Sequence, residues 1–148
     1  MLTTGTDPGG TRDASPAWSP DGSLIAFSRW ARNGRPQLYV IKPNGRGLKH
    51  LRPSQGNNPS WSPDSRRLAF DDGSRIAIVA LNGTTLKYLT RGPDDSDPAW
   101  SPDGRKIAFV RTESIGGNRL RDDLWMMDSN GRNARRLAKD ARQPAWRR

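Results

Sequence analysis

The sequence predicts an all-β chain, a partial β-propeller with three blades that are each a four-stranded antiparallel sheet. Three observations lead to this fold. A twelve-residue motif returns with a period near 40 residues, an Asn-Gly pair falls inside each period, and short apolar runs lie between these turn signals. A period of about 40–45 residues is typical of a propeller blade.

The motif is the strongest of these signals. Pro16 to Phe27 and Pro98 to Phe109 are identical at ten of twelve positions, and Pro59 to Phe70 has the same pattern with Ser65 in place of glycine. A fourth copy starts at Pro144, and the motif tryptophans are 43, 39 and 46 residues apart. We therefore expect one domain over 1–148, with repeats at about 12–51, 55–89 and 94–137 and partial repeats at 1–4 and 143–148. The residues that define the motif are Trp18, Pro20, Asp21, Gly22, Trp61, Pro63, Asp64, Trp100, Pro102, Asp103 and Gly104.

Two turn signals divide each repeat into four strands. In Ser-Pro-Asp-Gly, proline presets φ, aspartate bonds the backbone that follows, and glycine takes the left-handed conformation. The Asn-Gly pairs at 44–45, 82–83 and 130–131 predict two-residue type I′ hairpins. The first strand of each repeat is the Pro-x-Trp-Ser segment. The other predicted strands are 24–29, 37–42 and 48–51, then 67–71, 75–81 and 86–89, and finally 106–111, 123–128 and 134–137.

The third strands carry apolar residues at successive positions, as in Ile76 to Leu81. Such a run predicts burial on both faces, as in a blade between two neighbours. The fourth strands are more polar, which suits an outer edge protected by charge. The connection 112–122 is the longest between second and third strands and contains two glycines, so we expect a mobile loop there.

Composition limits the function classes. The chain has no cysteine, which excludes disulfides, thiol catalysis and cysteine-bound zinc. No apolar run is long enough to span a membrane, and the first residues do not form a signal peptide. The net charge of +10 is expected to serve solubility. If any surface binds nucleic acid, it is the basic stretch 132–148, although we consider a nucleic-acid partner the weaker hypothesis.

These residues resemble the WD40-like, or PD40, repeat of TolB-type β-propellers. The matching pattern is Pro-x-Trp-Ser-Pro-Asp-Gly, then an Ala-Phe strand, an apolar strand and Asn-Gly, in three copies. The resemblance implies a six- or seven-bladed parent propeller that binds proteins in the periplasm. It does not fix the function, since related propellers also accompany peptidases, lyases and sensor kinases.

Three blades leave an apolar face exposed at each end of the arc, and two copies would close a six-bladed ring. We therefore expect a homodimer. In such a ring Trp146 would compete with the partner's Trp18 for one place, and Leu2 would compete with Leu137. This overlap also fits a segment of a longer propeller.

Candidate sites are few. Ser15, Asn58, Asp97 and Gln143 each precede a Pro-x-Trp, and we expect them to form a hydrogen-bonding ring at the channel mouth. Capping of the local turns is the alternative for these four. The motif aspartates and tryptophans are assigned to turns and to packing between blades.

No catalytic or metal site is expected. His50 is the one histidine, and we expect it on the surface of an edge strand. The acidic cluster 94–97 is interpreted as a solvated loop rather than a cation site. We therefore expect a non-catalytic scaffold, without cofactors, that self-associates and binds protein. The alternatives are a propeller that accompanies an enzyme or sensor kinase, and a nucleic-acid-binding module.

Overall fold

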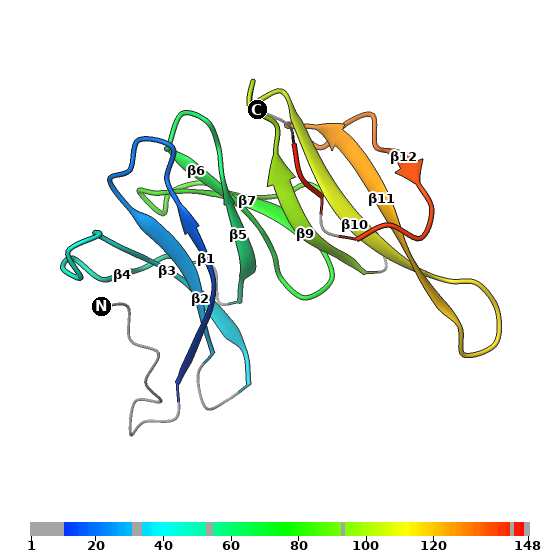
Figure 1. Ribbon diagram of the computed structural model, residues 1–148, viewed down its shortest axis with the longest axis horizontal. Helices are drawn as coiled ribbons and strands as arrows, with labels where there is room; N and C mark the ends of the chain where they lie inside the picture. The colour runs from blue at the N-terminus through cyan, green and yellow to red at the C-terminus, as the bar shows by residue number, and fades with distance from the viewer. Residues whose placement is uncertain (1–10, 31–33, 53–54, 93, 143, 147–148) are drawn as a thin grey trace.

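The computed structural model describes residues 11–30, 34–52, 55–92, 94–142 and 144–146. These residues form three four-stranded antiparallel sheets that stand side by side (Figure 1), and each sheet keeps its strands in chain order. Blade 1 consists of β1 (Arg12–Trp18), β2 (Ile25–Trp30), β3 (Pro36–Ile41) and β4 (Lys49–His50). Blade 2 consists of β5 (Asn57–Trp61), β6 (Arg67–Asp71), β7 (Ile76–Ala80) and β8 (Leu86–Tyr88). Blade 3 consists of β9 (Asp95–Trp100), β10 (Lys106–Ser114), β11 (Leu120–Asp128) and β12 (Arg135–Ala138).

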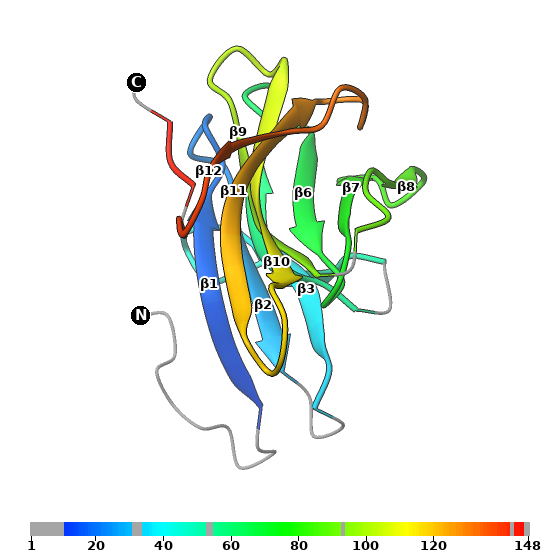
Figure 2. The same ribbon diagram turned by 90° about the vertical axis from the view of Figure 1, so that its right-hand side faces the viewer.

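This architecture confirms the predicted all-β fold and the three blades. The first strands β1, β5 and β9 contact one another from blade to blade, so they form the inner edge of the arc. The two views show the blades as a fan of twisted sheets (Figures 1 and 2). The described part of the chain contains no helix that is long and apolar enough to cross a membrane.

Blade 3 departs from the expected long loop. β10 and β11 continue pairing as far as Ser114 opposite Leu120, so only residues 115–119 connect them. Thr112 stands opposite Asp122 in this extension, and its hydroxyl donates a hydrogen bond to the Asp122 carboxylate at 2.6 Å. Cross-strand polar pairs of this kind stabilise a ladder. The prediction of a mobile loop over 112–122 was therefore wrong for most of its length.

The Asn-Gly turns are also built differently from the prediction. Only the glycines have positive φ, as at Gly45 (79°), whereas a type I′ turn needs positive φ at both residues. The Gly45 N–H donates to the Lys42 carbonyl at 2.9 Å, and the Arg46 N–H donates to the Asn44 side chain at 3.0 Å. The asparagine therefore caps the backbone two residues on, and the loop is longer than two residues. The same bonds recur at Asn82 and Asn130.

The Ser-Pro-Asp turns share one set of bonds. The Ser19 hydroxyl donates to the Asp21 carboxylate at 2.6 Å, and this carboxylate also accepts the Ser23 N–H at 3.0 Å. The serine hydroxyl is the main reason why the pKa of the Asp21 carboxyl lies below its usual range. Ser65 adopts φ of 58°, close to the 70° of the glycine at the same place in the first turn. The corresponding bonds in blades 2 and 3 involve Ser62 with Asp64 and Ser101 with Asp103.

The core lies between the sheets. One apolar cluster joins blades 1 and 2 around Leu38 and Phe70, and a second joins blades 2 and 3 around Ile76 and Phe109. In β7 four successive residues, Ile76 to Val79, are buried, because blade 2 lies between two neighbours. The corresponding strands of blades 1 and 3 are buried at alternate or fewer positions. Burial on both faces was therefore correct only for the middle blade.

Candidate binding site at the inner strands

A bulge in each first strand builds the candidate site. The pairing register shifts between Ala14 and Ala17 and between Asn57 and Ser60, and β9 has the same shift. A bulge re-aims a side chain, and it is one of the few places where a strand tolerates proline. The residues at these bulges that have positive φ are Ser15 (52°), Asn58 (48°) and Asp97 (50°). Each of them stands directly before a proline.

These bulges bring three of the four expected ring residues together. Ser15, Asn58 and Asp97 line one open hollow of about 260 Å³ on the inner strands. The fourth expected member, Gln143, lies outside the described residues. The prolines that follow the four ring positions complete the lining, and they are Pro16, Pro59, Pro98 and Pro144.

A chain of hydrogen bonds connects the blades at this hollow. The Ser15 hydroxyl donates to Asn58 Oδ1 at 2.9 Å, and Asn58 Nδ2 donates to Asp71 Oδ2 at 3.0 Å. Asp97 of blade 3 acts on the same carboxylate, since its backbone N–H lowers the pKa of Asp71 and its own carboxylate raises it. All three blades therefore contribute to one polar network.

Asp71 is the buried acid of the network. Its exposure is 3%, and this burial raises the pKa of its carboxyl, while the hydrogen bonds from Asn58 and Asp97 oppose the rise. Sequence reasoning missed Asp71 because the same strand position holds Ser28 in blade 1 and Val110 in blade 3. A residue that appears in one repeat only gives no repeat signal.

The site offers hydrogen bonds rather than a reaction centre. A hydroxyl, an amide and a carboxylate can together donate to and accept from the polar groups of a peptide. His50 lies on the outer strand β4, exposed, with its ring 5.0 Å from that of Tyr39. Among the residues that the structure describes, no group of three acidic, histidine or cysteine side chains is placed to hold a metal ion.

The motif tryptophans join successive blades. The Trp61 indole N–H donates to the Ala17 carbonyl at 2.9 Å, and the Trp146 indole N–H donates to the Ala99 carbonyl at 3.0 Å. Trp100 is buried as well, but it uses its backbone N–H, which donates to Ser60 Oγ at 3.1 Å. Trp18 is 60% exposed, since no blade precedes it in the described part of the chain. Trp18 is therefore the one motif tryptophan of the three full repeats that does not pack between blades.

The acidic cluster 94–97 is not the solvated loop that we expected. Asp95 lies in β9 with a fully buried side chain, and it forms a bidentate ion pair with Arg111 at 2.6 and 2.9 Å. The Arg111 guanidinium also lies 4.5 Å from the centroid of the Trp125 ring. Cross-strand pairing of the acid with a stacked arginine removes it from solvent.

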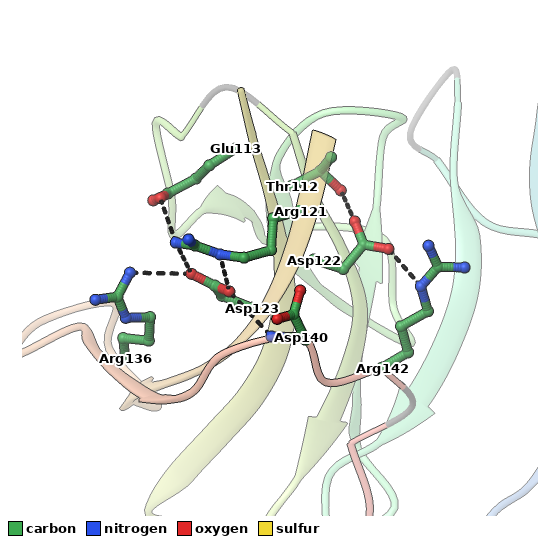
Figure 3. Close-up of polar contacts among 8 residues, drawn as sticks. All are labelled: Thr112, Glu113, Arg121, Asp122, Asp123, Arg136, Asp140 and Arg142. Atoms are coloured by element: carbon green, nitrogen blue, oxygen red, sulfur yellow. Dashed lines mark hydrogen bonds and ion pairs between the residues drawn. The ribbon is translucent and has the colours of Figure 1, made fainter. Parts of the chain in front are cut away.

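A second polar network lies on the outer half of blade 3 (Figure 3). Asp123 is fully buried and is bound by Arg121 at 2.7 Å and by Arg136 at 3.0 Å. The hydrogen bonds from Arg121 lower the pKa of the Asp123 carboxyl to about 2. Arg142 pairs with Asp122. Two arginines of the basic stretch 132–148 thus serve blade 3 itself, which leaves fewer of them for an anionic partner.

Comparison with known proteins decides the family. A family model described as the TolB beta propeller domain matches residues 4–148. The chain belongs to the TolB β-propeller family. A 37-residue segment is 51% identical to the Tol-Pal system protein TolB of Syntrophus aciditrophicus (strain SB), which covers 25% of this chain and 8% of that protein.

Two solved TolB structures have the same fold. The putative TolB from Agrobacterium tumefaciens superimposes with a TM-score of 0.75 at 24% identity, over 86% of this chain and 50% of that one. TolB from Acinetobacter baumannii superimposes with a TM-score of 0.70 at 26% identity, over 84% of this chain and 32% of that one. This TolB-family chain therefore spans at most about half the length of these relatives.

Proposed function

We propose that this chain is a non-catalytic, protein-binding propeller module of the TolB type, and that its binding surface is the hollow on the inner strands. The observation that carries the proposal is the bulge that holds Ser15, Asn58 and Asp97 at one position in three blades. Three different polar side chains in the same backbone conformation suit recognition of a polar peptide surface. The family relation favours a periplasmic protein partner.

We further propose that two copies join into a six-bladed ring. The support is the pair of end faces. Blade 1 presents Trp18, which is 60% exposed, and blade 3 presents Leu124 and Met126, which are half-buried. The middle blade shows that both faces of such a sheet become buried when it has two neighbours. Exposed apolar faces of this kind mark association surfaces.

The binding proposal is tested by calorimetric titration with the Pal protein of Syntrophus aciditrophicus, whose TolB shares the 51% identical segment. The test variant is Asn58→Gly with Asp97→Gly, because glycine keeps the positive φ of the bulge while removing the polar group. The matched control is Asn118→Gly with Asp94→Gly, which removes an exposed amide and an exposed acid elsewhere. Binding that is lost in the test variant and kept in the control supports the proposal. Equal binding by both variants, or no binding by the wild type, contradicts it.

A further inference from the structure

The last described segment, Pro144 to Trp146, is packed as the start of a following blade. Trp146 donates its indole N–H to the carbonyl of Ala99, the residue before the blade 3 tryptophan. Trp61 of blade 2 makes the same bond to Ala17, the residue before the blade 1 tryptophan. Pro144 lines the same hollow as the prolines of the three full blades. Figure 1 shows this segment, in red, beside β9.

A second copy would present the same three residues. Pro16, Ala17 and Trp18 have the same residue types as Pro144, Ala145 and Trp146. The exposed Trp18 indole is therefore suited to the Ala99 carbonyl of another chain. One backbone position gives room for one indole, so the two tryptophans exclude each other there.

The outer strands of the blades give a second indication that another copy of the chain binds at blade 3. Lys49 donates to the Leu81 carbonyl at 2.7 Å, and Lys87 donates to the Asn130 carbonyl at 3.0 Å, so each cation reaches the turn of the next blade. Arg135 occupies this strand position in blade 3, because it stands opposite Met126 as Lys87 stands opposite Ile78. Arg135 is exposed, and its side chain makes no such bond within the described part of the chain. The matching acceptors in a second copy are the carbonyls of its turn at 43–44.

We infer that Pro144 to Trp146 covers, on its own chain, the docking place for β1 of a second copy, so that self-association requires this segment to leave. The inference rests on the proposed self-association and adds its contact residues and its regulation. Trp146 is held less firmly than its counterpart. Trp61 is 7% exposed and lies in a paired strand, whereas Trp146 is half-buried in a segment that forms no strand. Exchange of one indole N–H bond for an equal one makes the displacement reversible.

The test is sedimentation equilibrium of the full 148-residue chain over a range of concentrations. We expect Trp146→Ala to strengthen dimerisation about tenfold, the effect of one competing contact. Trp146→Phe, which keeps the ring and removes the N–H, is expected to fall between. Trp18→Ala is expected to abolish the dimer in either background. The matched control is Lys139→Ala, at an exposed position shortly before the segment, which is expected to leave the dimer constant unchanged.

A crosslinking measurement covers the case in which a tryptophan variant unfolds. The chain has no cysteine, so Arg135→Cys with Asn44→Cys gives a pair that a short bis-maleimide joins between copies. A covalent dimer from the double variant, and none from either single variant, supports the interface. If the wild type dimerises and Trp146→Ala dimerises equally, the inference is wrong and self-association stands. If neither chain dimerises and no crosslink forms, self-association fails and the inference fails with it.

Discussion

Asn58 and Asp71 are hydrogen-bonded across β5 and β6, with Nδ2 of the amide 3.0 Å from Oδ2 of the acid. Asp71 is buried, and Asn58 also accepts from Ser15 of the preceding blade. The amide therefore connects a side chain at the hollow to an acid inside the fold. A substitution or a change of charge at Asp71 is therefore expected to affect the hollow through the side chain of Asn58.

The first prediction concerns the pH dependence of Asp71. Burial raises its folded-state pKa above the ordinary value of 3.8, so the folded chain binds this proton more tightly than the unfolded chain. The contribution of Asp71 to stability is therefore greatest at low pH and declines as the pH rises from about 4 through the raised pKa. Relative to Asp71→Asn, the wild type should lose unfolding free energy over this interval in urea titrations. A difference that is constant, or that grows with pH, would refute the prediction.

Asp123 is expected to have the opposite pH dependence. Its folded-state pKa is about 2, below the ordinary 3.8, because Arg121 and Arg136 bond the carboxylate. The stability from this group is present above pH 3.8 and is lost as the pH falls toward 2. The variant Asp123→Asn should be less stable at neutral pH and should lack this acid-side loss. Chemical denaturation between pH 2 and 5 measures both effects, and an unchanged acid limb in the variant would contradict the assignment.

Packing between blades predicts a large cost for Phe70→Ala. Phe70 is fully buried between blades 1 and 2, and removal of a buried aromatic ring costs about 3–5 kcal/mol. Ile76→Val, at a fully buried position facing blade 3, should cost about 0.5–1.5 kcal/mol. Leu86→Ala, at a position that is 43% exposed, is the control and should change the unfolding free energy by less than about 1 kcal/mol. A cost at Leu86 as large as that at Phe70 would argue against the blade interface as the core.

Two turn substitutions should have opposite signs. Gly104 has φ of 70° with nothing closer than 3.5 Å to an added Cβ, so Gly104→Ala meets backbone strain alone and should cost about 1 kcal/mol. Ser65 has φ of 58° at the equivalent place, and Ser65→Gly removes that strain. It loses only an exposed bond from the Asp21 N–H at 3.2 Å, so a gain of up to about 1 kcal/mol is expected. Thermal unfolding of both variants checks the signs, and a shared sign would contradict the strain argument.

The repeat made the blades predictable, because each blade repeats the same turn residues and apolar strands. The predicted strands at 67–71 and 106–111 lie within 67–71 and 106–114 in the structure. The equivalent placement of Ser15, Asn58 and Asp97 was also predictable, since each stands before a repeated proline, while a binding role for these residues stays a prediction. What the sequence did not predict depends on pairing between distant residues. No local pattern specifies a cross-strand partner. Four features depend on such a partner: the bulges, the ion pair of Asp95 with Arg111, the role of Asp71 and the longer β10–β11 hairpin.

The turn type of the Asn-Gly pairs failed for a local reason. Asn44 uses its side chain to accept a backbone N–H, so it has no need of the left-handed conformation that a type I′ turn demands. The same dipeptide satisfies both turn types, and the longer loop leaves only glycine at positive φ.

At the bulge before each inner proline, the backbone conformation stays the same while the side chain differs from blade to blade. Serine, asparagine and aspartate occupy the same backbone conformation in three successive blades, with φ between 48° and 52°. Each blade therefore presents one polar group in the same backbone conformation, and Asn58 differs from the other two because it also bonds the buried Asp71. A designer could change the polarity of the hollow at Ser15 and Asp97 with small polar residues that tolerate positive φ, whereas a change at Asn58 would also have to provide a partner for Asp71.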